Sequence, residues 1–264
     1  KRLGCIWGVS APPPGPHASS IMAAQVVSLI LSSLIATHLH GLADAQPRKI
    51  LALHGGGESA DSMQSGTRDL RSALGSGYEW VFASIGSRST GEVWWADPPS
   101  KGVPTTSRDH ASGMAAALDA IVASQGPFYA IMGYSQGAAA VPVYLAHAPD
   151  GTFAKAVMFC GYLPTTHTGL VSNINERSPF GGIPGLVWMG ALDPIISNPM
   201  SLGQAGVFVN PTTVTSESGG HAVPLRSDPT FDTVAAWIRE DAPTAAAPTA
   251  APTEALSGNE VTTA

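Results

Sequence analysis

The sequence predicts an α/β fold in which a mostly parallel sheet carries helices on both faces. Short apolar runs of strand length recur along the chain, amphipathic helical segments stand between several of them, and Gly- or Pro-rich loops separate the two kinds of segment. Strands that are apolar throughout are buried on both faces, and such strands alternating with helices are typical of a parallel sheet covered by helices.

The first half of the chain alternates strand and helix. Residues 49–54 (KILALH) are apolar and run into three glycines, which predicts a buried strand that enters a tight loop. Residues 62–74 predict a helix with charged residues between its apolar positions, and residues 79–84 (EWVFAS) predict a second strand. A loop rich in Gly, Pro and Ser over 85–106 leads to a helix over 109–124 with one apolar face.

The second half continues this alternation with shorter connections. Apolar or β-branched composition predicts the strands, and apolar residues spaced three and four apart predict the last helix. The proline at position 142 is expected to interrupt the helix that contains it. In order, these elements are strand 128–132 (FYAIM), helix 136–147, strands 155–160 (KAVMFC), 185–189 (GLVWM) and 212–216 (TTVTS), and helix 230–240.

Composition excludes several classes of protein. The 264 residues carry a net charge of −6, with 12% charged and 44% hydrophobic residues. This balance excludes a disordered polyelectrolyte and supplies enough apolar side chains for a sizeable core. A nucleic-acid partner is not expected, because the chain has no excess of positive charge. The two cysteines, Cys5 and Cys160, are too few for a disulfide-rich scaffold or a Cys-based zinc site.

The two ends of the chain differ from the middle. Residues 21–36 are apolar, uncharged and too short for a comfortable membrane span, and Ala43-Asp44-Ala45 matches a signal-peptidase site. Residues 1–45 are therefore expected to be a leader with a signal peptide over about 22–45, which predicts a secreted protein without a membrane span in the mature chain. The alternative is a cytoplasmic protein whose leader is a gene-model artefact. The Ala/Pro/Thr-rich segment 242–264 predicts a disordered tail, which leaves 47–240 as one catalytic domain.

A nucleophile motif lies between the third expected strand and the helix after it. Residues 133–137 read Gly-Tyr-Ser-Gln-Gly, which is the G-x-S-x-G elbow. In such an elbow the serine stands on a sharp turn with its hydroxyl clear of the sheet. The two glycines are needed because side chains at 133 and 137 would collide with neighbouring backbone. Ser135 is therefore the expected nucleophile.

A serine hydroxyl needs a histidine base, and that base needs a carboxylate to orient it. In α/β-hydrolases the acid and then the histidine follow the serine along the chain. His221, in a Gly-Gly-His-Ala-Val-Pro segment after the last strand, is favoured over His147 and His167. Asp193 is favoured as the acid because it follows the strand 185–189, although a turn-forming role before a proline is also open. The acids considered are Asp150, Glu176, Asp193, Glu217, Asp228 and Asp232.

The transition state also needs hydrogen-bond donors for its developing oxyanion. The expected donors are the backbone N–H groups of Gln136, next after the serine, and of Gly56, in the loop after the first strand. Trp94 and Trp95 lie in the loop after the second strand. They are candidates either for a substrate-binding aromatic wall or for packing of that loop onto the sheet. No metal is expected, because no cluster of His, Asp and Glu with ligand spacing surrounds the elbow.

Five short segments form a specific set: KILALHGGG (49–57), GYSQGAA (133–139), FCGY (159–162), GALDPII (190–196) and GGHAVP (219–224). Together, over about 48–240, they resemble the FSH-type serine hydrolases, a compact branch of the α/β-hydrolase superfamily. The resemblance implies an α/β-hydrolase fold with a small cap or none. It implies a cofactor-free esterase or thioesterase with the triad Ser135, Asp193 and His221, acting on a small acyl ester or thioester. Cys160 stands where that family usually has a serine.

Three functions remain open from the sequence. The favoured one is hydrolysis of carboxylic esters or thioesters through an acyl-enzyme on Ser135. A peptidase on the same fold and a catalytically silent binding protein are the alternatives. The segment 163–184, about 20 residues long, is too short for a large cap, which favours small ester substrates. The oligomeric state and the preferred acyl chain length stay undetermined.

Overall fold

We analysed a computed structural model, which describes residues 46–86, 88–89, 91–97 and 105–241. The chain divides into two compact units, Lys1–Gln46 and Pro47–Ala264, and every element described below belongs to the second unit. The expected signal peptide (22–45) and the expected disordered tail (242–264) lie outside the described residues. Within the described ranges no helix has the length and apolar character needed to cross a membrane.

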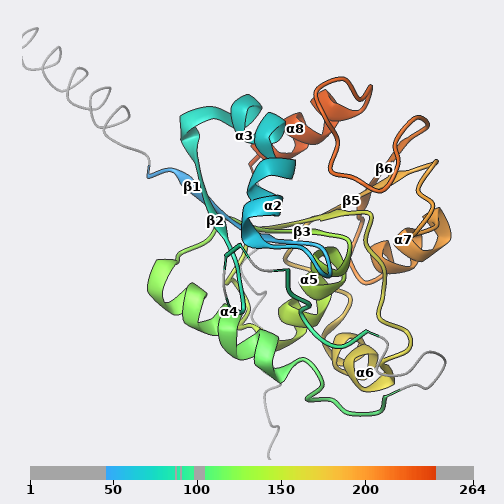
Figure 1. Cartoon of the computed structure of the whole chain (residues 1–264). Helices are drawn as coiled ribbons and strands as arrows, with labels where there is room; N and C mark the ends of the chain where they lie inside the picture. The colour runs from blue at the N-terminus through green and yellow to red at the C-terminus, as the bar shows by residue number, and fades with distance from the viewer. Residues whose placement is uncertain (1–45, 87, 90, 98–104, 242–264) are drawn as a thin grey trace, which may run out of the picture. The chain divides into compact units, whose positions relative to one another are not determined.

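The core of the unit is a six-stranded sheet in which every neighbouring pair of strands is parallel (Figure 1). This confirms the predicted α/β class. The spatial order is β2-β1-β3-β4-β5-β6. The strands are β1 (Arg48–Leu53), β2 (Tyr78–Phe82), β3 (Ala130–Tyr134), β4 (Lys155–Phe159), β5 (Gly185–Gly190) and β6 (Thr212–Ser216).

The strand order reverses direction between β1 and β3. The chain steps from β1 to β2 on one side, and then continues from β3 to β6 on the other side. In open α/β sheets, ligands bind at the carboxyl ends of the strands that flank such a switch point. Those ends hold the glycine run that follows β1 and the serine that follows β3.

Helices cover both faces of this sheet (Figure 1). One apolar cluster joins the sheet to α4, α5 and α6, and a second joins its other face to α2, α3 and α8. Because the sheet is buried on both sides, β1, β3 and β4 consist mainly of apolar residues. The helices are α2 (Ala60–Gly66), α3 (Arg68–Leu74), α4 (Ser112–Gln125), α5 (Gln136–His147), α6 (Thr168–Arg177), α7 (Asn198–Ala205) and α8 (Phe231–Arg239), and a 3₁₀ turn spans Gly75–Gly77.

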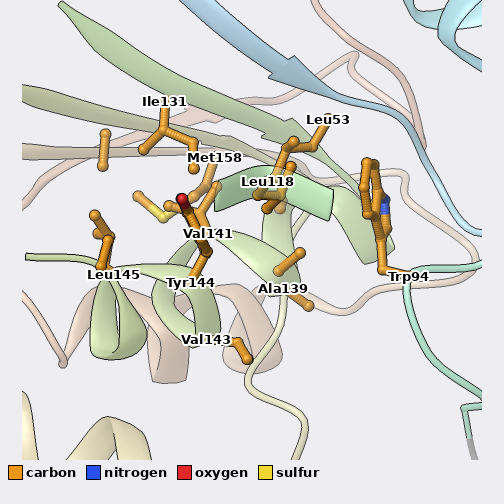
Figure 2. Close-up of a cluster of buried hydrophobic side chains, with 14 of the residues drawn as sticks. Leu53, Trp94, Leu118, Ile131, Ala139, Val141, Val143, Tyr144, Leu145 and Met158 are labelled. Atoms are coloured by element: carbon orange, nitrogen blue, oxygen red, sulfur yellow. The ribbon is translucent and has the colours of Figure 1, made fainter. Parts of the chain in front are cut away.

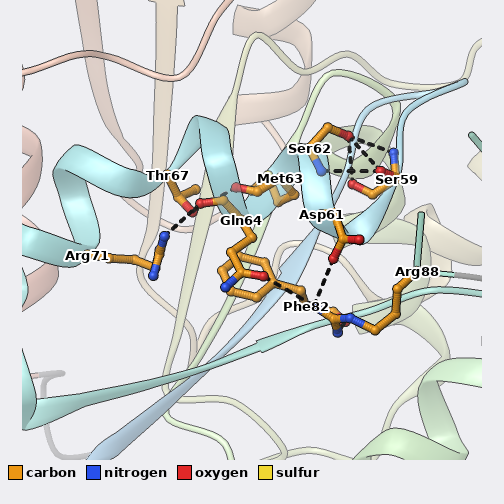
Figure 3. Close-up of polar contacts among 9 residues, drawn as sticks. All are labelled: Ser59, Asp61, Ser62, Met63, Gln64, Thr67, Arg71, Phe82 and Arg88. Carbon is orange, nitrogen blue, oxygen red and sulfur yellow. Dashed lines mark hydrogen bonds and ion pairs between the residues drawn. The ribbon is translucent and has the colours of Figure 1, made fainter. Parts of the chain in front are cut away.

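Helix α2 is held by polar contacts at both ends (Figure 3). At its start Ser59 and Ser62 form a capping box, in which each side chain bonds the backbone N–H of the other residue. The single helix expected over 62–74 is wrong: the structure divides it at Thr67. The Thr67 hydroxyl donates to the carbonyl of Met63 at 2.8 Å, and this bond to the backbone one turn earlier, with Gly66 beside it, favours the break.

Two further expectations about helices are corrected. Helix α5 runs without interruption through Pro142, because the carbonyl left without its usual donor, that of Ala138, accepts from the Gln204 side chain at 2.6 Å. Helix α6 lies within the segment 163–184, for which the sequence analysis predicted no helix. Gly169 in its first turn is required there, because a Cβ at that position would lie 2.3 Å from the carbonyl oxygen of Ser107.

Candidate active site

Ser135 occupies a strained turn between β3 and α5. Its backbone has φ 53° and ψ −119°, a conformation that is unfavourable for a residue with a side chain. A Cβ at Gly133 would lie 2.2 Å from the carbonyl oxygen of Gly137, and one at Gly137 would lie 2.4 Å from the carbonyl oxygens of Leu53 and His54. The steric reason given for the two glycines is therefore confirmed.

The structure brings Ser135, His221 and Asp193 together in one hydrogen-bonded chain. Nε2 of His221 lies 3.0 Å from Oγ of Ser135, and Nδ1 of His221 lies 2.7 Å from Oδ2 of Asp193. The Asp193 side chain is 1% exposed and that of His221 is 12% exposed. The three residues follow the ends of β3, β5 and β6. Ser135 and His221 are 86 positions apart in the sequence, yet they meet at one edge of the sheet.

The second oxygen of Asp193 fixes the orientation of the carboxylate. Oδ1 accepts the backbone N–H groups of Ile195 and Ile196, each at 2.8 Å. Burial by itself would raise the pKa of Asp193, but the hydrogen bonds from Ile196, His221 and Ile195 outweigh it and lower that pKa below its ordinary value. The turn-forming role of Asp193 and its contact with His221 therefore both hold, one on each oxygen.

The two residues expected to supply the oxyanion donors, Gln136 and Gly56, are neighbours in the structure. Gln136 is the first residue of α5, so its backbone N–H belongs to the positive end of that helix. Its side chain contacts Gly56, since a Cβ on Gly56 would lie 3.0 Å from Oε1 of Gln136. The same buried amide accepts the N–H of Trp94 at 3.1 Å and donates to the carbonyl of Trp95 at 3.0 Å. The glutamine side chain thus connects the elbow, the glycine loop and the tryptophan loop.

The structure favours the packing interpretation of the two tryptophans. Trp94 is 2% exposed and Trp95 is 4% exposed, so they present almost no surface to a ligand. Figure 2 shows Trp94 among the side chains of the core, next to Leu53 and Leu118. The Trp94 indole donates to the carbonyl of His54 at 2.8 Å and stacks on the His54 ring. Both rings are therefore used to anchor their loop to the sheet.

The competing histidines pair with other acids. Nε2 of His147 lies 2.8 Å from Oδ2 of Asp119, and both side chains are exposed. His167 is fully buried, and its Nε2 lies 3.0 Å from Asp97. Within the part of the chain that the structure describes, the histidine hydrogen-bonded to Ser135 is His221.

The competing acids also have other partners. Asp228 accepts hydrogen bonds from the hydroxyl groups of Ser216 and Thr230, whereas the carboxylate that is hydrogen-bonded to His221 is that of Asp193. Glu176 is paired with Arg108, and Asp150 with Arg177.

Two further residues belong to this site: Tyr134, which was not identified from the sequence, and Cys160, which stands where the family usually has a serine. The Tyr134 hydroxyl donates to the carbonyl of His221 at 2.9 Å, and its ring lies beside the imidazole. Its place before the serine in the elbow was the available signal. Cys160, at φ 50°, places its thiol near the carbonyls of Gly220 and Ala222, and burial raises its pKa to about 12. The thiol is thus protonated and a poor nucleophile.

Cys160, Asp193 and His221 also bring potential ligand atoms within 4.8 Å of one another. The 2.7 Å separation between Nδ1 of His221 and Oδ2 of Asp193 is that of a hydrogen bond, and it leaves no space for an ion between these two atoms. The donor set in this arrangement is that of a hydrogen-bonded relay rather than of a metal centre.

Known proteins give independent comparisons. The "Esterase OVCA2" of Xenopus tropicalis is 28% identical over 219 residues, which cover 72% of this chain and 92% of the relative. The "Esterase FUS5" of Gibberella fujikuroi is 26% identical over 69% of this chain and 82% of its own. The Zea mays acyl-protein thioesterase 2 structure superposes with a TM-score of 0.52 at 20% identity, over 74% of this chain and 94% of that one. The Bacillus cereus carboxylesterase structure gives a TM-score of 0.53 at 16% identity, over 74% of this chain and 88% of that one.

These two structures share the α/β-hydrolase fold with this chain. The model of the family described as "Serine hydrolase (FSH1)" matches residues 43–231, a range that contains the elbow, the acid loop and the histidine loop. The chain therefore belongs to the FSH1 family of serine hydrolases.

Proposed function

We propose that this protein hydrolyses carboxylic esters or thioesters through an acyl-enzyme on Ser135. The observation that carries the proposal is the chain of two hydrogen bonds from Ser135 through His221 to Asp193, built on a strained elbow. A serine, a histidine and a buried carboxylate in this order are the arrangement that activates a hydroxyl for acyl transfer. The esterase names of the sequence relatives agree with this reaction.

In the proposed acylation step, Oγ of Ser135 attacks the carbonyl carbon while Nε2 of His221 accepts the hydroxyl proton. The Asp193 carboxylate accepts the N–H at Nδ1, which holds the tautomer whose Nε2 is free to act as a base. The negative charge that develops on the carbonyl oxygen is stabilised by the N–H groups of Gln136 and Gly56. The C–O or C–S bond then breaks, and His221 returns the proton to the departing alcohol or thiol.

In the proposed deacylation step, water takes the place of the serine. His221 accepts a proton from that water, whose oxygen attacks the acyl carbon, and the bond to Oγ of Ser135 breaks as the proton passes to the serine. The products are a carboxylic acid and the regenerated enzyme. Protein groups carry out every step, so no metal and no cofactor is required in the proposal.

The experiment compares wild type with Ser135→Ala on p-nitrophenyl acetate and on an acetyl thioester. We expect turnover by wild type to be unaffected by EDTA, and turnover by Ser135→Ala to fall to the level of a protein-free control. Circular dichroism of both proteins checks that the fold is intact. Wild-type turnover in a folded Ser135→Ala protein would contradict the proposal, and so would loss of wild-type activity in EDTA.

We also propose that residues 22–45 direct the chain into the secretory pathway. The support is the apolar segment 21–36 followed by the Ala43-Asp44-Ala45 cleavage pattern. Expression of the full chain in eukaryotic cells, followed by N-terminal sequencing, tests it. Secreted protein that begins at Gln46 is expected, whereas cytoplasmic protein that retains the leader would contradict it.

A further inference from the structure

A cleft of about 220 Å³ opens beside the triad, between α2 and the loop that carries the histidine. Its walls include Met63 and Gly66 from α2, Tyr134 from the elbow, and His221 and Val223 from the loop after β6, with Glu58 also on the lining. The volume exceeds the roughly 150 Å³ of a cavity that binds benzene. The cleft therefore has room for an aromatic ring or a chain of about six carbons.

The position of the cleft relative to the triad determines which part of a substrate it receives. Of the three triad residues, only His221 lines it. In acylation, Nε2 of His221 must protonate the departing oxygen or sulfur, so the leaving group has to lie against this imidazole. A cleft walled by the base, and not by the nucleophile, is placed for the leaving group rather than for the acyl chain.

The chemistry of the walls selects what the cleft accepts. Met63 and Val223 are 2% and 6% exposed, and they belong to the apolar cluster under α2 and α8. They give the cleft an apolar floor that favours hydrocarbon. Glu58 is the one carboxylate among the lining residues, and its charge opposes an anionic group in the cleft.

The wall formed by α2 is fixed in place. The capping box of Ser59 and Ser62 holds its start, and Arg88 bonds Asp61 and Gln64 on one side of the helix and the carbonyl of Phe82 (Figure 3). A binding site with walls already ordered loses less entropy when a ligand enters. The cleft is thus preformed.

We propose that this cleft binds the alcohol or thiol part of the substrate and selects a neutral, apolar leaving group of ring or six-carbon size. The inference rests on the proposed function, since it assigns the leaving-group side of the same reaction. It makes Met63 and Val223 the contacts for this group, and Glu58 the residue that disfavours leaving groups with a negative charge.

Gly66 is the position at which the wall of the cleft can be enlarged. A Cβ at Gly66 would have no atom within 4 Å, so a leucine there can start its side chain from open space at the wall. Gly203 in α7 is the matched control, because a Cβ there also has no neighbour within 4 Å and this residue does not line the cleft. Both changes replace a helical glycine with leucine, and the melting temperature of each variant checks that its fold is retained.

The assay measures kcat/KM for methyl, hexyl and benzyl acetate, which vary the leaving group, and for methyl hexanoate, which varies the acyl group. We expect wild type to prefer benzyl over methyl acetate by about ten-fold or more, the ratio expected when a ring is buried. Gly66→Leu should remove this preference and leave kcat/KM for methyl acetate and methyl hexanoate within about two-fold, a change of about 0.4 kcal/mol. Gly203→Leu should match wild type on all four esters.

A second arm tests charge with benzyl acetate and 4-carboxybenzyl acetate. Wild type should discriminate against the carboxylate, and Glu58→Gln should reduce this discrimination by about three-fold or more, as expected for removal of a nearby like charge. The inference is overturned if Gly66→Leu lowers kcat/KM for methyl hexanoate in place of benzyl acetate, or lowers kcat/KM for all four esters equally. It is also overturned if the preference for benzyl over methyl acetate stays intact in Gly66→Leu. Failure of the proposed function looks different: no ester would then be hydrolysed in a manner dependent on Ser135.

Discussion

Replacing Asp193 by asparagine tests the relay with a change of a single atom. In wild type, Oδ1 accepts two backbone N–H groups, from Ile195 and Ile196, and Oδ2 faces Nδ1 of His221 at 2.7 Å. An asparagine in this place keeps its carbonyl oxygen on the two backbone donors, because the reverse orientation would put its NH₂ group against two N–H groups. The amide NH₂ then faces Nδ1 and donates to it.

This reversal changes the tautomer of the base. If Nδ1 of His221 accepts a hydrogen bond, the ring proton moves to Nε2, and Nε2 can no longer accept the proton of Ser135. The corresponding change in a serine protease reduces kcat by about 10⁴-fold, which is about 5 kcal/mol of transition-state stabilisation. We expect a loss of the same order in Asp193→Asn, with the melting temperature little changed.

The matched control is Asp228→Asn. Asp228 also accepts a backbone N–H, from Thr230, and lies on the His221 loop, but it bonds hydroxyl groups in place of the histidine. We expect kcat of Asp228→Asn within about ten-fold of wild type, since the altered group does not touch reacting atoms. Steady-state kinetics on p-nitrophenyl acetate measure both variants. Near-normal kcat in Asp193→Asn, or equal losses in the two variants, would refute the tautomer argument.

Three further predictions concern groups around the site. Gln136→Ala should lower kcat and cost about 2–5 kcal/mol in the free energy of unfolding by urea, because the Trp94 N–H and the Trp95 carbonyl lose their buried partner; an unchanged kcat would contradict this. In a Cys5→Ser background, Cys160 should react with a thiol reagent at pH 8 at least about 10³-fold more slowly than a free cysteine. The reason is that a pKa of about 12 leaves only about 10⁻⁴ of the Cys160 side chain as thiolate at this pH. Rapid labelling of the native protein would contradict this prediction. The pKa of Asp228 in the folded protein is below its ordinary value, because hydrogen bonds from Thr230 and Ser216 outweigh the effect of burial. The stability that this carboxylate gives is therefore complete above about pH 4, and it is lost as the pH falls through the lowered pKa. The melting temperature should therefore fall less steeply from about pH 5 to pH 2 in Asp228→Asn than in wild type; equal slopes would contradict this.

The elements that were predicted well have strong local signals. The glycines of the elbow could be interpreted from the sequence because the turn they allow involves neighbouring residues. The structure shows the expected collision with backbone for a side chain at Gly133 or Gly137. The apolar runs of β1, β3 and β4 likewise predict buried strands without information from elsewhere in the chain.

Helix α7 was missed because its buried face is polar. The sequence NPMSLGQA has no apolar stripe, and its buried residues include Ser201 and Gln204. Ser201 donates to the carbonyl of Gly161, and Gln204 donates to the carbonyl of Ala138, the group that Pro142 leaves unpaired. Both partners are at least 40 residues away, so no local pattern could indicate them.

The burial of the tryptophans depends on distant partners in the same way. The loop that contains Trp94 and Trp95 is fixed by the amide of Gln136, about 40 residues later, and by the carbonyl of His54. Composition indicates that such a loop carries aromatic residues, but it does not indicate whether they face a ligand or the core. The hydrogen bonds to Gln136 and His54 decide that the two tryptophans face the core, and these bonds form only when the elbow and the loop meet in the folded chain.

The central claim, that His221 activates Ser135 as a nucleophile, is tested most directly by labelling with a fluorophosphonate. This reagent forms a covalent bond with an activated serine, and mass spectrometry of the intact protein and its peptides locates the adduct. We expect one adduct per chain, on the peptide that contains Ser135, and we expect no adduct in Ser135→Ala and strongly slowed labelling in His221→Ala. An adduct on a different residue, or labelling of His221→Ala at the wild-type rate, would contradict the account.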